Sequence, residues 1–318
     1  MRRVALSVLA MALTMAGAIA GATPKLASAA AGDPDWLNEI NVYREASGLQ
    51  LVSEQPSWDM GLQEHLTYLG LTPSSYLAGA YESEHTENPA SPYYTPRGAQ
   101  EAGSSNLLAG GADTSLAAID RWLAAPFHAV GMLRPALSQV AFVRDSTFES
   151  AGLDVISGFD LSAPPSTTPV LFPGNGMTTD LTTFGGEQPS PVGSCAPAAS
   201  PAQAYGLPII ALLPQAPDPA LLAQVRGPDG SVESSQDGSL CVVDEDTYQS
   251  TDPIYGPTGA QILQGDKAVF LIPNAPLTAG RHWVTITQPG QPDISWSFVV
   301  APTEVPQSAG STTWHCHG

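Results

Sequence analysis

The amino-acid sequence predicts two successive domains, an α+β domain followed by an all-β sandwich. In the first half, segments with apolar residues three and four positions apart are typical of helices, and two later segments alternate like strands. The second half holds seven short apolar runs between turn residues and no helical period. A stretch rich in proline, serine and threonine at 162–169 separates the halves and predicts a linker.

The length of 318 residues fits two domains, and a hydrophobic content of 43% can fill sizeable cores. Near the N-terminus, two arginines precede an apolar run and a small-residue cleavage pattern at Ala27-Ser28-Ala29, which is typical of a secretory signal peptide. An uncleaved membrane anchor is the alternative. The expected segments are a signal peptide at 1–29, the first domain at 30–161, the linker at 162–169, the β-sandwich at 170–302 and a flexible tail at 303–318.

The charge balance restricts the class of partner. Acidic residues outnumber basic ones 30 to 11, for a formal net charge of −19. Such a chain repels nucleic acids and anionic lipids at long range, so we expect no nucleic acid partner. We expect a secreted protein with no integral membrane span after signal cleavage and with an extracellular or cell-envelope ligand. The sequence carries no signal for that ligand's identity or for the oligomeric state.

Two helices are expected at the start of the first domain. The first follows Asp35, a suitable N-cap, and ends before Gly48. The second, at 58–69, contains His65, and a histidine in mid-helix is more typical of packing than of ligation.

A third helix at 116–123 leads to a second histidine of interest. Thr114 or Asp113 would cap its start, and Pro126 is expected to end it, because a proline ring disfavours helical geometry in the preceding residue. His128 would then lie on the following turn and face a cleft. Strands are expected at 139–143 and 152–156.

Residues 70–103 read as an irregular but ordered loop that carries His85. Glu82, Glu84 and Glu87 surround this histidine in sequence. Nearby carboxylates favour the protonated imidazole, so we expect them to raise the pKa of His85.

The second half of the chain supplies strands and cysteines. The apolar runs that predict strands lie at 170–172, 209–213, 222–225, 240–243, 268–272, 283–287 and 296–300. Cys195 and Cys241 are expected to form a disulfide because both lie in one predicted domain of an exported chain. Cys316 is left over between His315 and His317, where the alternatives are a soft-metal site and a flexible tail with a free or intermolecular thiol.

Several motifs in the first half resemble one known family. Leu37-Asn38 to Arg44, followed by Gly48-Leu49, is similar to the family's first helix, and His85-Thr86 matches a histidine segment of its bacterial members. Trp122, Pro126 and His128 have the spacing of Trp-x-x-Ser-Pro-x-His, the most specific motif of the set. Residues 36–159 thus resemble the CAP superfamily of cysteine-rich secretory proteins, antigen 5 and pathogenesis-related proteins, in its bacterial secreted form.

This resemblance implies an α-β-α sandwich and a cleft. In the family, two histidines and two acids line a cleft that can hold a divalent metal. His85 and His128 match the histidines, whereas Ser105 stands where a glutamate is usual, and Glu101 is a nearby substitute. The expected ligand cleft therefore consists of His85, His128, Glu101 and Ser105. Zinc or another divalent metal would bind at the two histidines, and no residue is assigned a catalytic role.

The second half is similar to immunoglobulin- or fibronectin-like modules, with Trp296-Ser297-Phe298 resembling a last-strand motif. Three functions stay open. The first is a non-catalytic binding module displayed by a β-sandwich spacer, and the second is a metal-dependent hydrolase of peptides or cell-envelope material. The third is a carrier of lipids or small apolar ligands, which no feature of the sequence favours.

Overall fold

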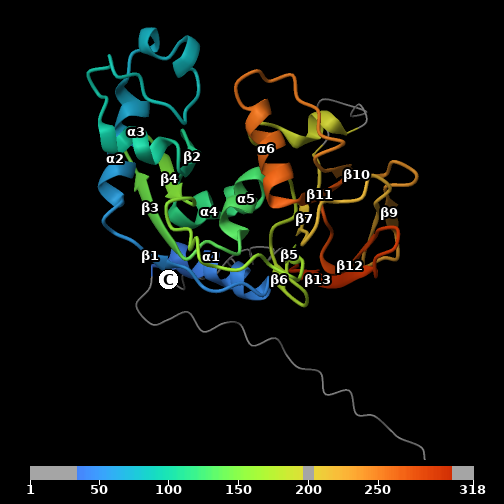
Figure 1. The fold of residues 1–318 in the computed structure, drawn as a ribbon. Helices are drawn as coiled ribbons and strands as arrows, with labels where there is room; N and C mark the ends of the chain where they lie inside the picture. Colours follow the sequence, from blue (N-terminus) through green and yellow to red (C-terminus); the bar gives the residue numbers. More distant parts are fainter. Residues whose placement is uncertain (1–33, 196–203, 303–318) are drawn as a thin grey trace, which may run out of the picture.

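The structure, a computed structural model, describes residues 34–195 and 204–302 (Figure 1). The expected signal peptide at 1–29 and the tail with His315, Cys316 and His317 lie outside the described residues. Within the two described ranges, every helix is too short or too polar to cross a membrane.

The N-terminal region is a mixed α+β unit. Its helices are α1 (Asp35–Ala46), α2 (Asp59–Leu71), α3 (Pro96–Ala102), α4 (Ser115–Leu123) and α5 (Pro126–Leu133), with short 3-10 turns at Ser74–Tyr76 and Gly79–Tyr81. Its strands are β1 (Ser53–Glu54), β2 (Ser105–Leu108), β3 (Gln139–Asp145) and β4 (Ser150–Asp154), which form one sheet in the order β1-β3-β4-β2.

Helices cover both faces of this sheet. On one face α2 packs on β3 and β4, with Leu62 close to Gly152. On the other face, Trp36 of α1 and Trp122 of α4 contact Phe142 of β3. The result is the expected α-β-α layering, and β4 is buried at every position because both of its faces are covered.

Two prolines begin helices that the sequence pattern does not predict. Pro96 opens α3, and the side chain of Thr95 accepts a hydrogen bond from the Gly98 amide. Helix α4 ends at Leu123, as expected, but Pro126 then opens α5, so His128 lies in the first turn of α5 and not on a turn. Proline suits this position because the first helical N–H has no intrahelical partner.

The C-terminal region is rich in strands. Its elements are β5 (Val170–Phe172), β6 (Thr178–Thr179), a 3-10 turn (Pro191–Ser194), β7 (Ile209–Leu212), β8 (Leu222–Arg226), β9 (Val232–Ser234), β10 (Leu240–Val243), α6 (Gly256–Asp266), β11 (Ala268–Pro273), β12 (Gly280–Thr287) and β13 (Ile294–Val300). All seven expected strands are present, and β6, β9 and α6 are additional. The structure also contains the Cys195–Cys241 disulfide.

These strands form two sheets, with the orders β10-β11-β7-β5 and β6-β13-β12-β8-β9. Helices α5 and α6 pack against the first sheet, which lies between them and the second sheet (Figure 1). Strands β7 and β11 are therefore buried at every position. A single cluster of buried apolar side chains extends through both regions, so α5 is packed from both sides.

Candidate functional site

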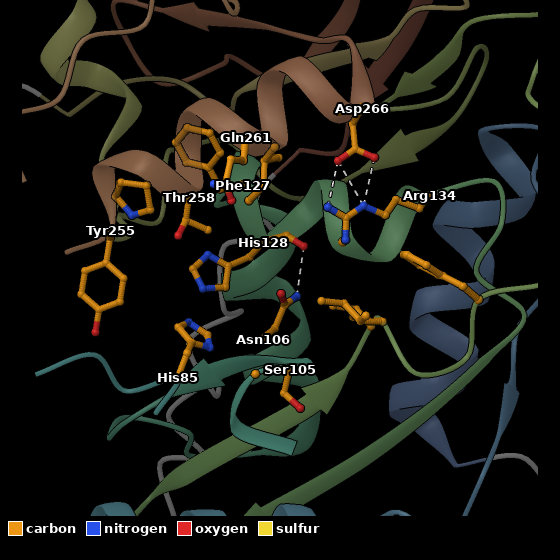
Figure 2. A pocket seen from close by; sticks show the side chains of 18 of the residues that line it. His85, Ser105, Asn106, Phe127, His128, Arg134, Tyr255, Thr258, Gln261 and Asp266 are labelled. Carbon is orange, nitrogen blue, oxygen red and sulfur yellow. Dashed lines mark hydrogen bonds and ion pairs between the residues drawn. The ribbon is translucent and has the colours of Figure 1, made fainter. Parts of the chain in front are cut away.

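A cleft of about 700 Å³ lies between the N-terminal region and α6 (Figure 2). One wall comes from α5, β2 and the end of β4, and the other from α6 and the segment Gln188-Pro189. Much of the lining is apolar, namely Phe127, Pro135, Ala136, Val155, Ile156, Phe159, Pro189 and Ile262. The C-terminal region is therefore part of the cleft, which corrects the expectation that it acts only as a spacer.

Helix α5 is held at both of its ends. Ala125 stands at the N-cap without a side chain that can accept a hydrogen bond. Glu187, from the C-terminal region, supplies the acceptor, with Oε1 3.1 Å from the Phe127 amide and Oε2 3.3 Å from the His128 amide. At the other end the buried guanidinium of Arg44 donates to the carbonyls of Met132 and Leu137. A carboxylate at the N-terminus and a cation at the C-terminus both interact favourably with the helix dipole.

Glu187 also orients the ring of His128. Its Oε2 lies 2.8 Å from Nδ1 of His128, and its side chain is fully buried. A carboxylate can only accept at this contact, so Nδ1 carries a proton and Nε2 is the ring nitrogen left to act on a ligand. This pair gives His128 the fixed ring orientation that a hydrogen-bonding group, a base or a metal ligand requires.

His85 is oriented in a similar way by a backbone group. Its Nδ1 lies 2.9 Å from the carbonyl oxygen of Ala102, which can only accept, so Nδ1 is protonated and Nε2 holds a lone pair. The ring meets the edge of Tyr255, at the start of α6, with centroids 6.2 Å apart. The hydroxyl of Tyr255 in turn accepts a hydrogen bond from the Glu84 amide.

The structure brings the two predicted histidines together. His85 and His128 lie near each other at the main cleft (Figure 2), and both also line an adjoining hollow of about 380 Å³. Burial lowers the pKa of His85, against the opposing effect of its hydrogen bond to the Ala102 carbonyl, and the neighbouring imidazoles of His128 and His65 lower it further. His85 is therefore neutral at physiological pH.

The expected effect of the glutamates on His85 is wrong. Glu87 is buried and pairs with His65, with Nδ1 and Oε1 2.9 Å apart. Glu84 contributes only its backbone carbonyl, 2.9 Å from Nε2 of His65. Burial therefore outweighs these carboxylates at His85, and His65 is a fully buried structural histidine, as its position in mid-helix indicates.

The other two predicted cleft residues differ in location. Ser105 begins β2 and lines the cleft, and its buried hydroxyl has no hydrogen-bond partner among the described residues. Glu101 lies elsewhere: it is 4% exposed and packs against Gly61 of α2 beside Asp154. Burial, with the carboxyl of Asp154 beside it, raises the pKa of Glu101 to about 8. The structure thus corrects the expectation that Glu101 lies on the cleft wall.

These residues do not complete a metal site. A catalytic zinc ion takes three protein ligands, whereas the cleft offers two imidazole nitrogens. Within residues 34–195 and 204–302, no group of three or more histidine, cysteine or acidic side chains is placed to hold a metal ion. We therefore derive no chemical step through a metal.

Sequence reasoning missed the residues that the C-terminal region contributes. Glu187 and Tyr255 support the histidines, and Asp266 of α6 binds Arg134 with both carboxylate oxygens, at 2.8 to 3.1 Å. The absence of a capping side chain at Ala125 is the one local signal that an acceptor must come from elsewhere.

Comparison with known proteins supports the resemblance in the first half of the chain. Residues 37–147 match the family model described as CAP, the cysteine-rich secretory protein family. Comparison with curated proteins and with solved structures returned no match. The matched segment covers α1 to β3, including both cleft histidines and the helix that Glu187 caps. Residues 37–147 of this chain are therefore identified as a CAP domain.

Proposed function

We propose that this protein is a secreted binding protein that holds a small organic ligand in the cleft between its CAP domain and α6. The observation that carries the proposal is the cleft of about 700 Å³ with an apolar lining and two imidazoles at its edge. A concave, largely apolar site with a few convergent polar groups is typical of small-molecule binding.

The polar groups specify the kind of contact. His85 presents an unprotonated Nε2, which accepts a hydrogen bond from an amide or hydroxyl group of the ligand, and Nε2 of His128 is the second ring nitrogen available to the ligand. The apolar part of the ligand would pack on Val155, Ile156 and Phe159. The proposal assigns no catalysis, although the His128–Glu187 pair has the chemistry of a general base.

We further propose that residues 170–302 form an immunoglobulin-like sandwich joined to the CAP domain by the segment 162–169. The two largely antiparallel sheets of this region support the proposal. In this arrangement the module completes the cleft through Glu187 and α6.

Fragment binding followed by saturation-transfer NMR tests the proposed cleft. The probes are a panel of aromatic amides and alcohols, with matched N-methyl amides and methyl ethers that lack the donor. Thr258 is exposed on α6 and lines the cleft, so Thr258→Trp fills it without disturbing the core. Gln264→Trp, on the same helix but away from the cleft lining, is the matched control.

We expect donor-bearing fragments to bind the wild type and the control and to lose signal with Thr258→Trp and with His128→Ala. Binding that is equal in all four proteins would contradict the proposal. Hydrolysis of casein or of purified cell-wall peptides by the wild type, abolished in His128→Ala, would instead support an enzyme.

The second candidate is a divalent-metal-dependent hydrolase acting on peptide or cell-envelope substrates. The observation in its favour is that both Nδ1 atoms are held by acceptors, which leaves the two Nε2 atoms as the ring nitrogens available to a metal at one cleft. Calorimetric titration with zinc, on the wild type and on His85→Ala, tests it. Micromolar binding that His85→Ala removes is expected if metal binds there, and no heat from the wild type rules it out.

A further inference from the structure

The sheet β6-β13-β12-β8-β9 has one buried face and one solvent-exposed face. Its strands alternate: Val225, Val284 and Phe298 are buried, whereas their neighbours along each strand point outward. This exposed face is separated from the His85–His128 cleft by the sheet β10-β11-β7-β5 (Figure 1). It is therefore a surface that the CAP domain and its cleft do not use.

A tryptophan lies in the middle of this face. Trp283 of β12 is 45% exposed, and it is flanked on the neighbouring strands by Arg226 of β8 and Ser297 of β13. An indole on a flat sheet offers a wide aromatic surface to solvent. Its neighbours are polar, so it is not the edge of an apolar core.

The same face concentrates positive charge on an acidic protein. Arg226 pairs with Trp283 across the strands, and Arg281 lies two residues before Trp283 on the same face. The guanidinium of Arg281 donates to the Ser297 hydroxyl, whereas that of Arg226 has no hydrogen bond or ion pair with the described residues. Strands β8, β12 and β13, all fully described, contain no acidic residue, although the chain has 30.

Short polar side chains complete the surface. Gln224 is exposed on β8, and the hydroxyls of Thr285 and Ser295 lie 3.3 Å apart across β12 and β13. Amide, hydroxyl and guanidinium groups around an exposed aromatic ring can hydrogen-bond with the many hydroxyls of a sugar. The C–H groups of a pyranose carry partial positive charge and stack on the electron-rich face of an indole.

We propose that this face, formed by Gln224, Arg226, Arg281, Trp283, Thr285 and Ser297, binds an acidic polysaccharide. Trp283 stacks on a sugar ring, and Arg226 and Arg281 pair with the carboxylates of uronic-acid-type units. Charge complementarity selects this occupant: the net charge of −19 repels a polyanion in general, but this acid-free face attracts one. The inference does not rest on the function proposed for the cleft.

Affinity electrophoresis of the full chain, in gels that contain polygalacturonate or the neutral polymer dextran, tests the proposal. The variants are Trp283→Ala, Arg226→Gln and Arg281→Gln. Tyr93→Ala and Arg97→Gln are matched controls, because Tyr93 is 37% exposed, the Arg97 side chain is 59% exposed and both lie in the CAP domain. Thermal melting confirms that each variant is folded, which we expect because all of the altered side chains are exposed.

We expect polygalacturonate, but not dextran, to retard the wild type and both controls. Trp283→Ala should weaken binding about tenfold or more, and each arginine variant several-fold, with a smaller dependence on salt than the wild type. Three results would overturn the proposal. They are no retardation of the wild type by polygalacturonate, retardation that Trp283→Ala leaves unchanged, and a dimer in sedimentation equilibrium that Trp283→Ala dissociates.

Discussion

Nδ1 of His128 lies 2.8 Å from Oε2 of Glu187, a residue 59 positions further along the chain. The same carboxylate receives the amides of Phe127 and His128 at the start of α5. One side chain of the C-terminal region thus caps a helix of the CAP domain and orients the ring of a cleft histidine. The two regions are coupled at the candidate site.

Replacing Glu187 by alanine should lower the free energy of unfolding by about 2–3 kcal/mol, because it removes a helix cap and the partner of a partly buried histidine. Urea unfolding measures the change. Glu45→Ala, which removes an exposed carboxylate on α1, should change stability by less than about 0.5 kcal/mol. Equal losses in the two variants would show that Glu187 has no special role.

Arg44→Met should be more damaging. The Arg44 side chain is 0% exposed and donates to four carbonyls, of Gln50, Met132, Arg134 and Leu137. Methionine matches much of the volume but leaves these acceptors unpaired, so we expect a loss of about 3 kcal/mol or more. Arg44→Lys should recover part of this loss, and a methionine variant as stable as the wild type would be contrary evidence.

The raised pKa of Glu101 predicts that the free energy of unfolding falls as pH rises. Its pKa is raised from 4.5 to about 8 in the folded chain, so the folded state keeps a proton that the unfolded state releases. The resulting stabilisation is complete below pH 4.5 and is lost as pH rises to about 8. Urea unfolding of the wild type at pH 5, 6.5 and 8.5 should show this decline.

Glu101→Gln should flatten the profile between pH 6 and 8. Asp120→Asn is the control. The pKa of Asp120 is raised only to about 6, by burial and by the charge of Asp180, so this residue changes the free energy of unfolding only below about pH 6. If the free energy of unfolding of Glu101→Gln falls above pH 6 as steeply as that of the wild type, a group other than Glu101 holds the proton.

Loss of the Cys195–Cys241 disulfide should cost about 4 kcal/mol in the chain-entropy model, because the bond closes a loop of 46 residues. The double variant Cys195→Ser with Cys241→Ser, compared with the wild type in urea, measures the cost. Dithiothreitol should destabilise the wild type and leave the double variant unchanged. A response of the double variant to the reductant would point to another disulfide.

Local pattern predicted much of the fold. The seven expected strands are present because alternation and turn residues are properties of each segment on its own. Helix α6 was missed because it begins with Gly256 and Pro257 and buries little more than Leu263, so it shows no apolar stripe. Helix α4 ends before Pro126 as predicted, but the turn predicted at His128 was wrong because the same proline opens α5.

The sequence predicted only those residues of the candidate site that lie in the CAP domain. His85 and His128 follow from motif spacing, and the structure places both at one cleft. Glu187 could not be found in the same way, because no pattern in residues 180–190 indicates which distant helix a glutamate will cap. Glu101 was predicted from its proximity in sequence, but its carboxyl lies beside Asp154 of β4 and against α2, away from the cleft.

The uninterrupted apolar cluster bears on how the protein can be divided. Phe127 of the CAP domain meets Phe270 edge to face at 5.1 Å, and Tyr43 lies against Phe172 at 5.5 Å. A cut at residues 162–169 would separate these aromatic rings from their partners and leave each fragment with an exposed apolar surface. Expression of the CAP segment alone should therefore yield aggregates, and functional work on this protein calls for the undivided chain.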